Sequence, residues 1–151
     1  FERVSEDIVS EGGLVNKFVG DGILAIFGAP IPLENSSLAA VRAGTKIRET
    51  VRLINGDDSS QNLPNIDIGL GIHTGPVLAG NIGSKSRMEY TVIGDTVNIA
   101  SRVENLCKEF GKDFLITKSV KDQILDAGFK PIFLDSVKIR GKENLSDIYW
   151  L

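Results

Sequence analysis

The stretch "VNKFVGDGILAIFGAP", residues 15–30, predicts a β-hairpin with an acidic residue at its tip. Two short, apolar and β-branched runs, Leu14–Val19 and Ile23–Phe27, flank Gly20-Asp21-Gly22. Glycine and aspartate both suit tight hairpin turns, so the pattern needs no function to explain it. A carboxylate at a hairpin tip is also well placed for a hard cation such as Mg²⁺, which takes one or two protein carboxylates together with phosphate oxygens. Asp21 is therefore both a turn residue and a candidate metal ligand.

Helical and strand patterns alternate on both sides of this hairpin. Phe1, Val4 and Ile8 recur at helical spacing before it, and Gly12-Gly13 ends that helix. Asn35 or Ser36 is expected to cap a helix that follows, and Asp95 or Thr96 a long helix that reaches Phe110, with a short helix ending at Gly128. Further strands are expected at residues 66–72, 77–82, 91–93, 114–117, about 132–139 and 147–151. Helices interleaved with paired strands predict an α/β or α+β sandwich in which helices cover a mixed sheet.

Composition indicates one globular domain. The 151 residues are 42% hydrophobic and 25% charged, with a net charge of −3 and a pI near 5.2. The chain therefore lacks the excess of positive charge that typically accompanies binding to nucleic acid or to an anionic membrane. A single cysteine, Cys107, excludes an internal disulfide and fits a cytoplasmic location, and no apolar run approaches the ~20 residues of a membrane span. The sequence begins at Phe1, which suggests a piece of something longer.

The helix that starts near Asp95 carries a second candidate group. Asn98 and Arg102 lie four residues apart and share a face with Asn105 and Glu109, away from the apolar stripe Val97-Ala100-Val103. Periodicity alone favours a solvated polar face. A guanidinium beside an amide would also suit stabilisation of charge that develops on a phosphoryl group. The only histidine, His73, is interpreted as structural, and the P-loop pattern is absent.

Three stretches taken together resemble a known family. "VNKFVGDGILAIFGAP", "GIHTGPVLAGNIGS" and "YTVIGDTVNIASRVEN" resemble the class III nucleotidyl cyclase catalytic domain, and most of all bacterial adenylate cyclases with a Lys/Thr pair at the base-selecting positions. The resemblance implies an α+β fold: a ferredoxin-like βαββαβ core with a C-terminal extension, in which helices cover a mixed, mostly antiparallel sheet. It implies a head-to-tail homodimer with two sites at its interface, and "GSKSRMEYT" as an arm toward the partner. The implied reaction converts ATP to cyclic AMP and pyrophosphate with two Mg²⁺ or Mn²⁺ ions.

The same resemblance implies a role for each matching residue that meets the substrate. Lys17 matches the lysine that reads adenine, and Thr91 occupies the second base-selecting position, where guanylate cyclases carry Cys. A lysine donates to the N1 acceptor of adenine and would meet the N1–H donor of guanine. Lys142, in "KIRGKE", matches the lysine that holds the triphosphate.

The remaining matches concern metal and catalysis. Asp21 matches one of two metal-binding aspartates, Asn98 the residue that orients the ribose, and Arg102 the arginine that stabilises the transition state. In the implied dimer Asp21 serves the site formed with the partner, while the other matching residues share one site. Losing Arg102 should lower turnover more than ATP affinity.

The chain departs from the family pattern at its front. The family domain opens with a strand and helix that carry "F-x-D-I-x-G-F-T" and the first metal aspartate, and nothing here matches them. Glu6-Asp7 lies on the following helix and cannot take that place by register. We therefore expect residues 1–151 to be an N-terminally truncated catalytic domain, inactive or nearly so alone, with a central strand missing from its sheet.

Alternatives remain open from the sequence. A guanylate or broad purine nucleotide cyclase is conceivable, because Thr91 is smaller and less selective than aspartate. A non-catalytic homologue that acts as a dimerisation or regulatory module is another, although the joint presence of the matching residues argues against it. A diguanylate-forming enzyme is disfavoured, because "GG-[DE]-[DE]-F" is absent. The family's attached sensor, receptor or membrane segments are not identifiable here, and bicarbonate sensitivity is associated with the threonine-bearing subgroup.

Overall fold

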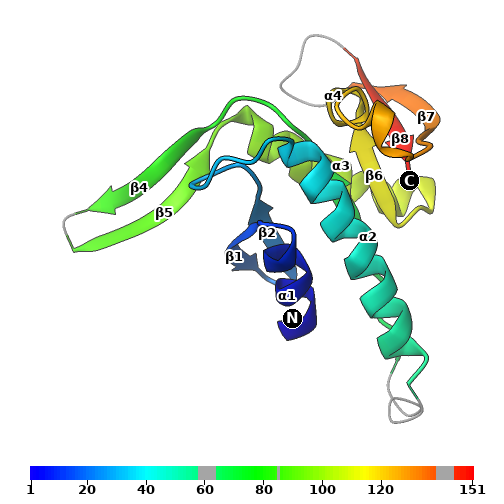
Figure 1. The fold of residues 1–151 in the computed structure, drawn as a ribbon, viewed down its shortest axis with the longest axis horizontal. Coiled ribbons are helices and arrows are strands. Elements are labelled where there is room, and N and C mark those ends of the chain that lie inside the picture. Colours follow the sequence, from blue (N-terminus) through cyan, green and yellow to red (C-terminus); the bar gives the residue numbers. More distant parts are fainter. Residues whose placement is uncertain (58–63, 85, 139–144) are drawn as a thin grey trace.

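The computed structural model describes residues 1–57, 64–84, 86–138 and 145–151. Its elements follow the predicted alternation of helices and strands (Figure 1). In chain order they are α1 (Glu2–Ser10), β1 (Leu14–Val19), β2 (Gly22–Ile26), α2 (Ser36–Asn55), β3 (Leu70–Ile72), β4 (Leu78–Ser84), β5 (Arg87–Ile93), α3 (Asp95–Phe110), β6 (Phe114–Thr117), α4 (Lys118–Lys121), the 3₁₀ turn η2 (Leu125–Ala127), β7 (Ile132–Val137) and β8 (Ser146–Trp150).

The strands of the described residues form three sheets. The largest has the order β3-β6-β8-β7, while β1-β2 and β4-β5 are separate two-stranded hairpins. Among the strand pairs of the described residues, β3 and β6 alone run parallel, and the other pairs are antiparallel. The succession α1-β1-β2-α2-β3 matches the αββαβ part of the expected βαββαβ core, so α1 takes the place of the first core helix, which was expected to be absent together with the first strand. The predicted α+β class, with a mixed and mostly antiparallel arrangement, is confirmed.

The core lies on both faces of the largest sheet. Strand β6 is fully buried, and its side chains alternate between two apolar clusters. Phe114 and Ile116 join the cluster that includes Val41 of α2, whereas Leu115 joins the cluster of Val103 on α3. Helices α2 and α3 therefore cover opposite faces of this sheet; the sequence pattern predicted helices over a mixed sheet but not which face each one covers.

The β4-β5 hairpin forms an arm that projects from the body of the domain (Figure 1). Its strands pair without interruption from Leu78 opposite Ile93 to Ser84 opposite Arg87. The expected strand of only residues 91–93 was too short, because neither face of this arm is continuously buried and no apolar alternation marks it. Leu78, Met88 and Ile93 are exposed on it.

Two local predictions need correction. The alternating apolar residues from Ile66 predicted a strand over 66–72, but β3 begins only at Leu70 and Ile66 is 46% exposed. Helix α3 is preceded by Gly94 at its N-cap and not capped by Asp95 or Thr96; the Thr96 hydroxyl donates instead to the Pro76 carbonyl at 2.7 Å. A strand forms only where a neighbouring strand pairs with it, and the Thr96 hydroxyl bonds to an acceptor that lies far away in the sequence. A local sequence pattern contains neither the neighbouring strand nor that acceptor.

Helix α2 starts as predicted. The Asn35 side chain accepts a hydrogen bond from the backbone N–H of Leu38 at 2.8 Å, which satisfies one of the free donors of the first turn. The buried face of α2 includes Ala40, Ala43 and Ile47, which were expected to line it.

Glycine brings β3 and α3 into close contact. A Cβ built on Gly71 would lie 2.2 Å from the backbone nitrogen of Glu104 and 2.8 Å from the carbonyl oxygen of Ala100. The strand therefore packs directly on the backbone of α3, and Arg102 lies on the helix between these two contact points.

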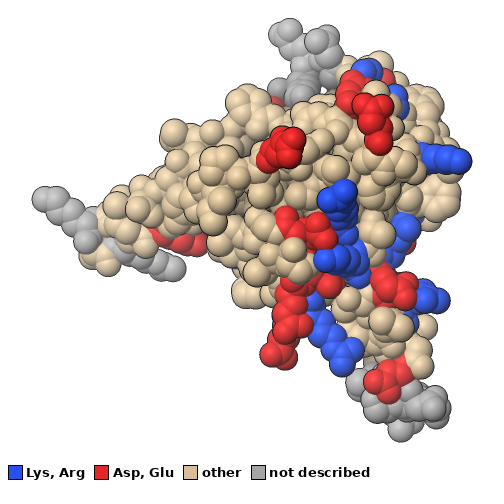
Figure 2. Space-filling model, in the orientation of Figure 1, with Lys and Arg blue, Asp and Glu red and all other residues tan. Residues whose placement is uncertain are grey.

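No helix in the described part of the chain is long and apolar enough to cross a membrane. Acidic and basic side chains are interspersed on the face shown in Figure 2, without a large patch of one sign.

Candidate active site

The tip of the β1-β2 hairpin presents Asp21 to solvent. Val19 pairs with Gly22, so Gly20 and Asp21 form a two-residue turn. Gly20 has a φ of +62°, whereas the φ of Asp21 is not positive. A positive φ at the first turn residue only is the pattern of a type II′ turn. Glycine alone thus takes the positive φ that the sequence assigned to either residue. Asp21 itself is exposed at the tip.

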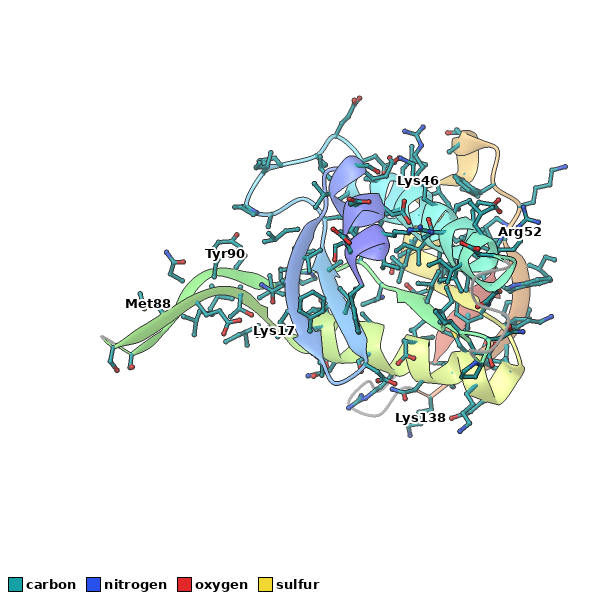
Figure 3. The ribbon with its side chains drawn as sticks, turned by 90° about the horizontal axis from the view of Figure 1, so that it is seen from below. Lys17, Lys46, Arg52, Met88, Tyr90 and Lys138 are labelled. Carbon is teal, nitrogen blue, oxygen red and sulfur yellow. The ribbon has the colours of Figure 1, made fainter. Side chains whose placement is uncertain are left out.

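The two residues expected to read the base lie on elements that approach each other. The Lys17 ammonium is 3.6 Å from a carboxylate oxygen of Glu89 on β5. The Thr91 hydroxyl, two residues farther along β5, donates to Asn16 Oδ1 at 3.1 Å. Figure 3 shows Lys17 on the side of β1 toward the β4-β5 arm, which carries Tyr90 and Met88. The structure therefore brings β1 and the middle of β5 together.

Sequence reasoning missed Asn16 and Glu89 at this approach. Asn16 also donates from Nδ2 to the Tyr90 carbonyl at 2.8 Å, so one side chain contacts two successive residues of β5. The available signal for Asn16 was its place beside Lys17, where the two polar residues interrupt an apolar strand run. Glu89 carried no comparable signal, because it lies in a polar stretch.

Helix α3 supplies the other candidate residues. Asn98 is exposed, as are Asn105 and Glu109 of the predicted polar face. Arg102 differs from them, because it is partly buried and its Nη1 atom is inaccessible and has no hydrogen-bond partner within the described structure. A buried, unpaired guanidinium nitrogen is costly, and an anion or a polar oxygen would satisfy it.

The described residues do not complete a two-ion metal site. They contain no group of three or more His, Cys, Asp or Glu side chains that could hold a metal. Asp21 alone offers one carboxylate, which suits a single hard cation only if phosphate oxygens supply other ligands. Lys142, the expected triphosphate ligand, lies outside the described residues.

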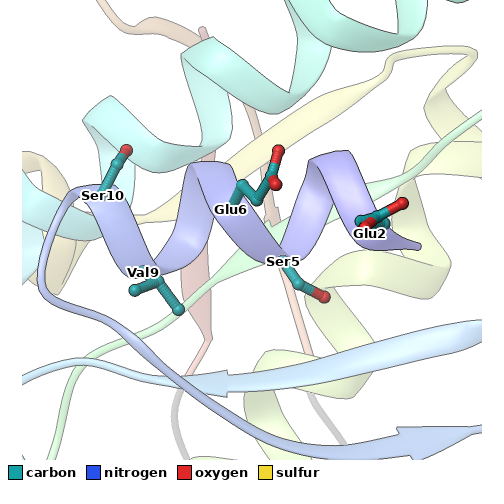
Figure 4. Close-up of a pocket in the computed structure, with 5 residues that line it drawn as sticks. All are labelled: Glu2, Ser5, Glu6, Val9 and Ser10. Carbon is teal, nitrogen blue, oxygen red and sulfur yellow. The ribbon is translucent and has the colours of Figure 1, made fainter.

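Two other features are separate from these residues. His73 Nδ1 lies 2.9 Å from the Thr117 hydroxyl and 3.3 Å from that of Ser119, in agreement with its structural interpretation. A shallow hollow of about 450 Å³ lies along α1 (Figure 4) and is lined by Glu2, Ser5, Glu6, Val9 and Ser10, none of them an expected site residue.

Comparison with known proteins agrees with this geometry. The family described as adenylate and guanylate cyclase catalytic domain matches residues 10–151. Adenylate cyclase 1 of Rhizobium meliloti (strain 1021) is 33% identical over 150 residues, covering 99% of this chain and 22% of that protein. The crystal structure of the adenylyl cyclase CyaB from P. aeruginosa superposes with a TM-score of 0.87 at 28% identity, covering 99% of this chain and 76% of that one. The guanylyl cyclase Cya2 gives a TM-score of 0.84 at 30% identity, covering 99% and 75%.

The chain therefore belongs to the class III adenylate and guanylate cyclase catalytic domain family. It spans less than a third of the length of curated relatives such as adenylate cyclase 1 of Rhizobium meliloti (22%) and the adenylate cyclase of Anabaena cylindrica (28%). Since solved adenylyl and guanylyl cyclases both superpose closely, the fold by itself does not distinguish ATP from GTP.

Proposed function

We propose that this domain is an adenylate cyclase, in which the ribose 3′-OH of ATP attacks the α-phosphate and releases pyrophosphate, forming cyclic AMP. The observation that carries the proposal is Arg102, a partly buried guanidinium with an unpaired Nη1 on the helix that also carries Asn98. Negative charge that grows on the α-phosphate oxygens would pair with this nitrogen. Because the donor is held in place before the reaction, little reorganisation is needed when the charge develops.

Each remaining residue has a role that its chemistry suits. Lys17 donates to adenine N1, Thr91 meets the 6-amino group, and Asn98 orients the ribose. Lys142 holds the triphosphate. The approach of β1 to β5, which brings Lys17 and Thr91 to one region, supports the first two roles.

Cyclases of this class are generally metal-dependent, and we propose two Mg²⁺ or Mn²⁺ ions, with Asp21 as one ligand. When bound, such ions activate the nucleophile and neutralise phosphate charge. The described residues supply too few carboxylates for both, so the proposal requires a further carboxylate from an upstream strand. Unpaired strand edges could hydrogen-bond to such a strand: one edge of β3 is unpaired within the described sheets, and the β1-β2 hairpin is hydrogen-bonded to no other strand there.

The proposed active form is a head-to-tail homodimer. Lys17, Thr91, Asn98 and Arg102 of one protomer would face Asp21 of its partner. Exposed apolar side chains on the β4-β5 arm, which the resemblance assigns to the partner contact, support this arrangement. Regulatory or sensor domains would belong to the complete protein.

A guanylate cyclase is the second candidate, favoured by the close superposition of Cya2. Assay of the complete protein with ATP or GTP and Mn²⁺ separates the two candidates, because the products, cyclic AMP and cyclic GMP, can each be measured directly. Formation of neither would favour a non-catalytic dimerisation or regulatory module.

Replacement of Arg102 tests the catalytic role. Arg102→Ala should lower kcat by about 100-fold and change KM for ATP by less than about three-fold, since the partner charge grows only in the transition state. Arg52→Ala is the matched control: Arg52 is exposed on α2 and pairs with Glu49 at 2.7 Å. An Arg102→Ala protein with full turnover would refute the role.

A further inference from the structure

A β-bulge in β1 places two neighbouring side chains against β5. Val15 pairs with Ala25 and Lys17 with Leu24, so Asn16 is an extra residue without a partner on β2. A bulge bends the strand and re-aims its side chains. In this hairpin Lys17 reaches Glu89 and Asn16 reaches Tyr90 and Thr91, although β1 and β5 belong to different sheets.

The two hydrogen bonds of Asn16 fix the orientation of its amide. The Tyr90 carbonyl can only accept, so the Asn16 atom that contacts it at 2.8 Å must be the donor Nδ2. The other amide atom, Oδ1, is an acceptor only. The Thr91 hydroxyl, 3.1 Å from Oδ1, must therefore donate its single proton to Asn16.

We infer that Asn16 is a specificity-determining positioning residue, which makes the Thr91 hydroxyl an acceptor toward the purine; this rests on the proposed function of the domain. A hydroxyl has one proton and two lone pairs, and Asn16 engages the proton. What remains for a ligand is a lone pair. It pairs with the 6-amino group of adenine, a donor, and opposes O6 of guanine, an acceptor.

This polarity removes the ambiguity that a threonine would otherwise bring to base selection. A freely rotating hydroxyl donates or accepts as required, and would tolerate either purine. A hydroxyl whose proton is held by Asn16 accepts only, so an unpaired acceptor-to-acceptor contact penalises guanine. The selectivity of Thr91 thus depends on a residue 75 positions away in the sequence.

The test compares the ATP-to-GTP ratio of kcat/KM in the complete protein. Asn16→Leu keeps the approximate size but releases the Thr91 proton, and should lower this ratio by about 3- to 10-fold. Asn16→Asp still accepts from Thr91, so it should keep the ratio within about two-fold even though it loses the bond to Tyr90 and some stability. If Asn16 only held β1 against β5, Asn16→Asp should change the ATP-to-GTP ratio of kcat/KM as much as Asn16→Leu does, because the carboxylate would repel the Tyr90 carbonyl and loosen that contact.

Asn55→Leu is the matched control. Like Asn16, Asn55 at the end of α2 makes two hydrogen bonds through its amide, but both are to the backbone: Nδ2 donates to the Ile66 carbonyl at 3.0 Å, and Oδ1 accepts from the Ile66 N–H at 2.9 Å. It should lose comparable stability without a change in the nucleotide ratio. In a Thr91→Val background, Asn16→Leu should add no further change in the ratio, because both variants act through one hydroxyl.

The same ratio measured as Kd, by competition of ATP and GTP against a fluorescent ATP analogue, separates this inference from the proposed function. If the wild type forms no cyclic nucleotide but Asn16→Leu lowers the Kd preference for ATP, the proposed function fails and the inference stands. If the wild type cyclises ATP and Asn16→Leu leaves both ratios within two-fold, the inference is overturned and the function stands. A wild type that binds neither purine nucleotide overturns both.

Discussion

Substitution of Gly71 by alanine tests whether β3 holds helix α3 in place. The added methyl group would lie 2.2 Å from Glu104 N, 2.6 Å from Glu104 Cα and 2.8 Å from the Ala100 carbonyl oxygen. All three are backbone atoms of one helix, so no side chain can rotate away, and the helix or the strand must move. Overpacking by one methyl group costs typically 1–3 kcal/mol, and the immobile neighbours place this case near 3 kcal/mol.

Part of this cost is offset, because glycine inside a strand is itself unfavourable by roughly 0.5–1 kcal/mol relative to alanine. The expected net loss is about 2 kcal/mol, which lowers the Tm of a domain of this size by about 4–8 °C. Urea unfolding followed by circular dichroism gives the free energy, and thermal melting gives the Tm. Turnover below the Tm should fall as well, because Asn98 and Arg102 lie on the displaced helix.

Alanine substitutions at two further glycines allow the loss of stability to be compared across positions with different amounts of space. A Cβ on Gly69 would meet the Glu104 carboxylate at 3.1 Å and Cys107 Cβ at 3.2 Å, whereas a Cβ on Gly80 would meet no described atom beyond its chain neighbours within 4 Å. The expected order of destabilisation is therefore Gly71→Ala, then Gly69→Ala, with Gly80→Ala near neutral. Equal stability of the Gly71→Ala and Gly80→Ala proteins, within about 0.5 kcal/mol, would show that β3 does not restrain α3 as inferred.

Burial raises the pKa of the Cys107 thiol from 9.0 to about 11. In native protein at pH 8 only about one thiol in a thousand is therefore ionised. Labelling by a thiol reagent should be slow until urea unfolds the chain. Because the folded pKa is the higher one, the stability from the neutral thiol is intact below pH 9 and declines as pH rises toward 11; fast labelling at pH 8 without denaturant would contradict the burial. Asp21→Asn should raise the Mn²⁺ concentration for half-maximal activity at least about 10-fold, as loss of a metal ligand predicts, with the Tm unchanged because asparagine also suits turns; an unaltered metal requirement would exclude Asp21 as a ligand.

The parts of the fold that the sequence predicted are those fixed by local chemistry. The β1-β2 hairpin follows from two apolar runs around a glycine turn, and α2 begins at a residue whose side chain caps it, Asn35. The run from Ile66 misled for the same reason, because alternation is local while strand pairing is not. The length of the β4-β5 arm was hidden because its apolar residues lie at the surface.

The sequence predicted which residues belong to the candidate site, but not how those residues contact one another in space. Resemblance supplied Lys17 and Thr91, and the structure adds that β1 approaches β5 through side chains and not through a strand ladder. The link from Asn16 to Thr91 spans 75 positions, so no window of sequence contains it. Periodicity placed Arg102 on an exposed face, and tertiary packing overrode it by burying one nitrogen of its guanidinium.

Helix α3 combines two features that each lower stability when taken alone. An unpaired buried guanidinium nitrogen costs about 1–3 kcal/mol or more, and a glycine inside β3 forgoes side-chain packing. The two features lie together: Gly71 lets the strand contact the backbone of α3 at Ala100 and Glu104, on either side of Arg102, so the helix cannot move closer to the strand there. The Nη1 donor of Arg102 has no hydrogen-bond partner within the described residues. An anionic phosphoryl group would recover that lost interaction, and would do so most strongly where its charge is greatest, in the transition state.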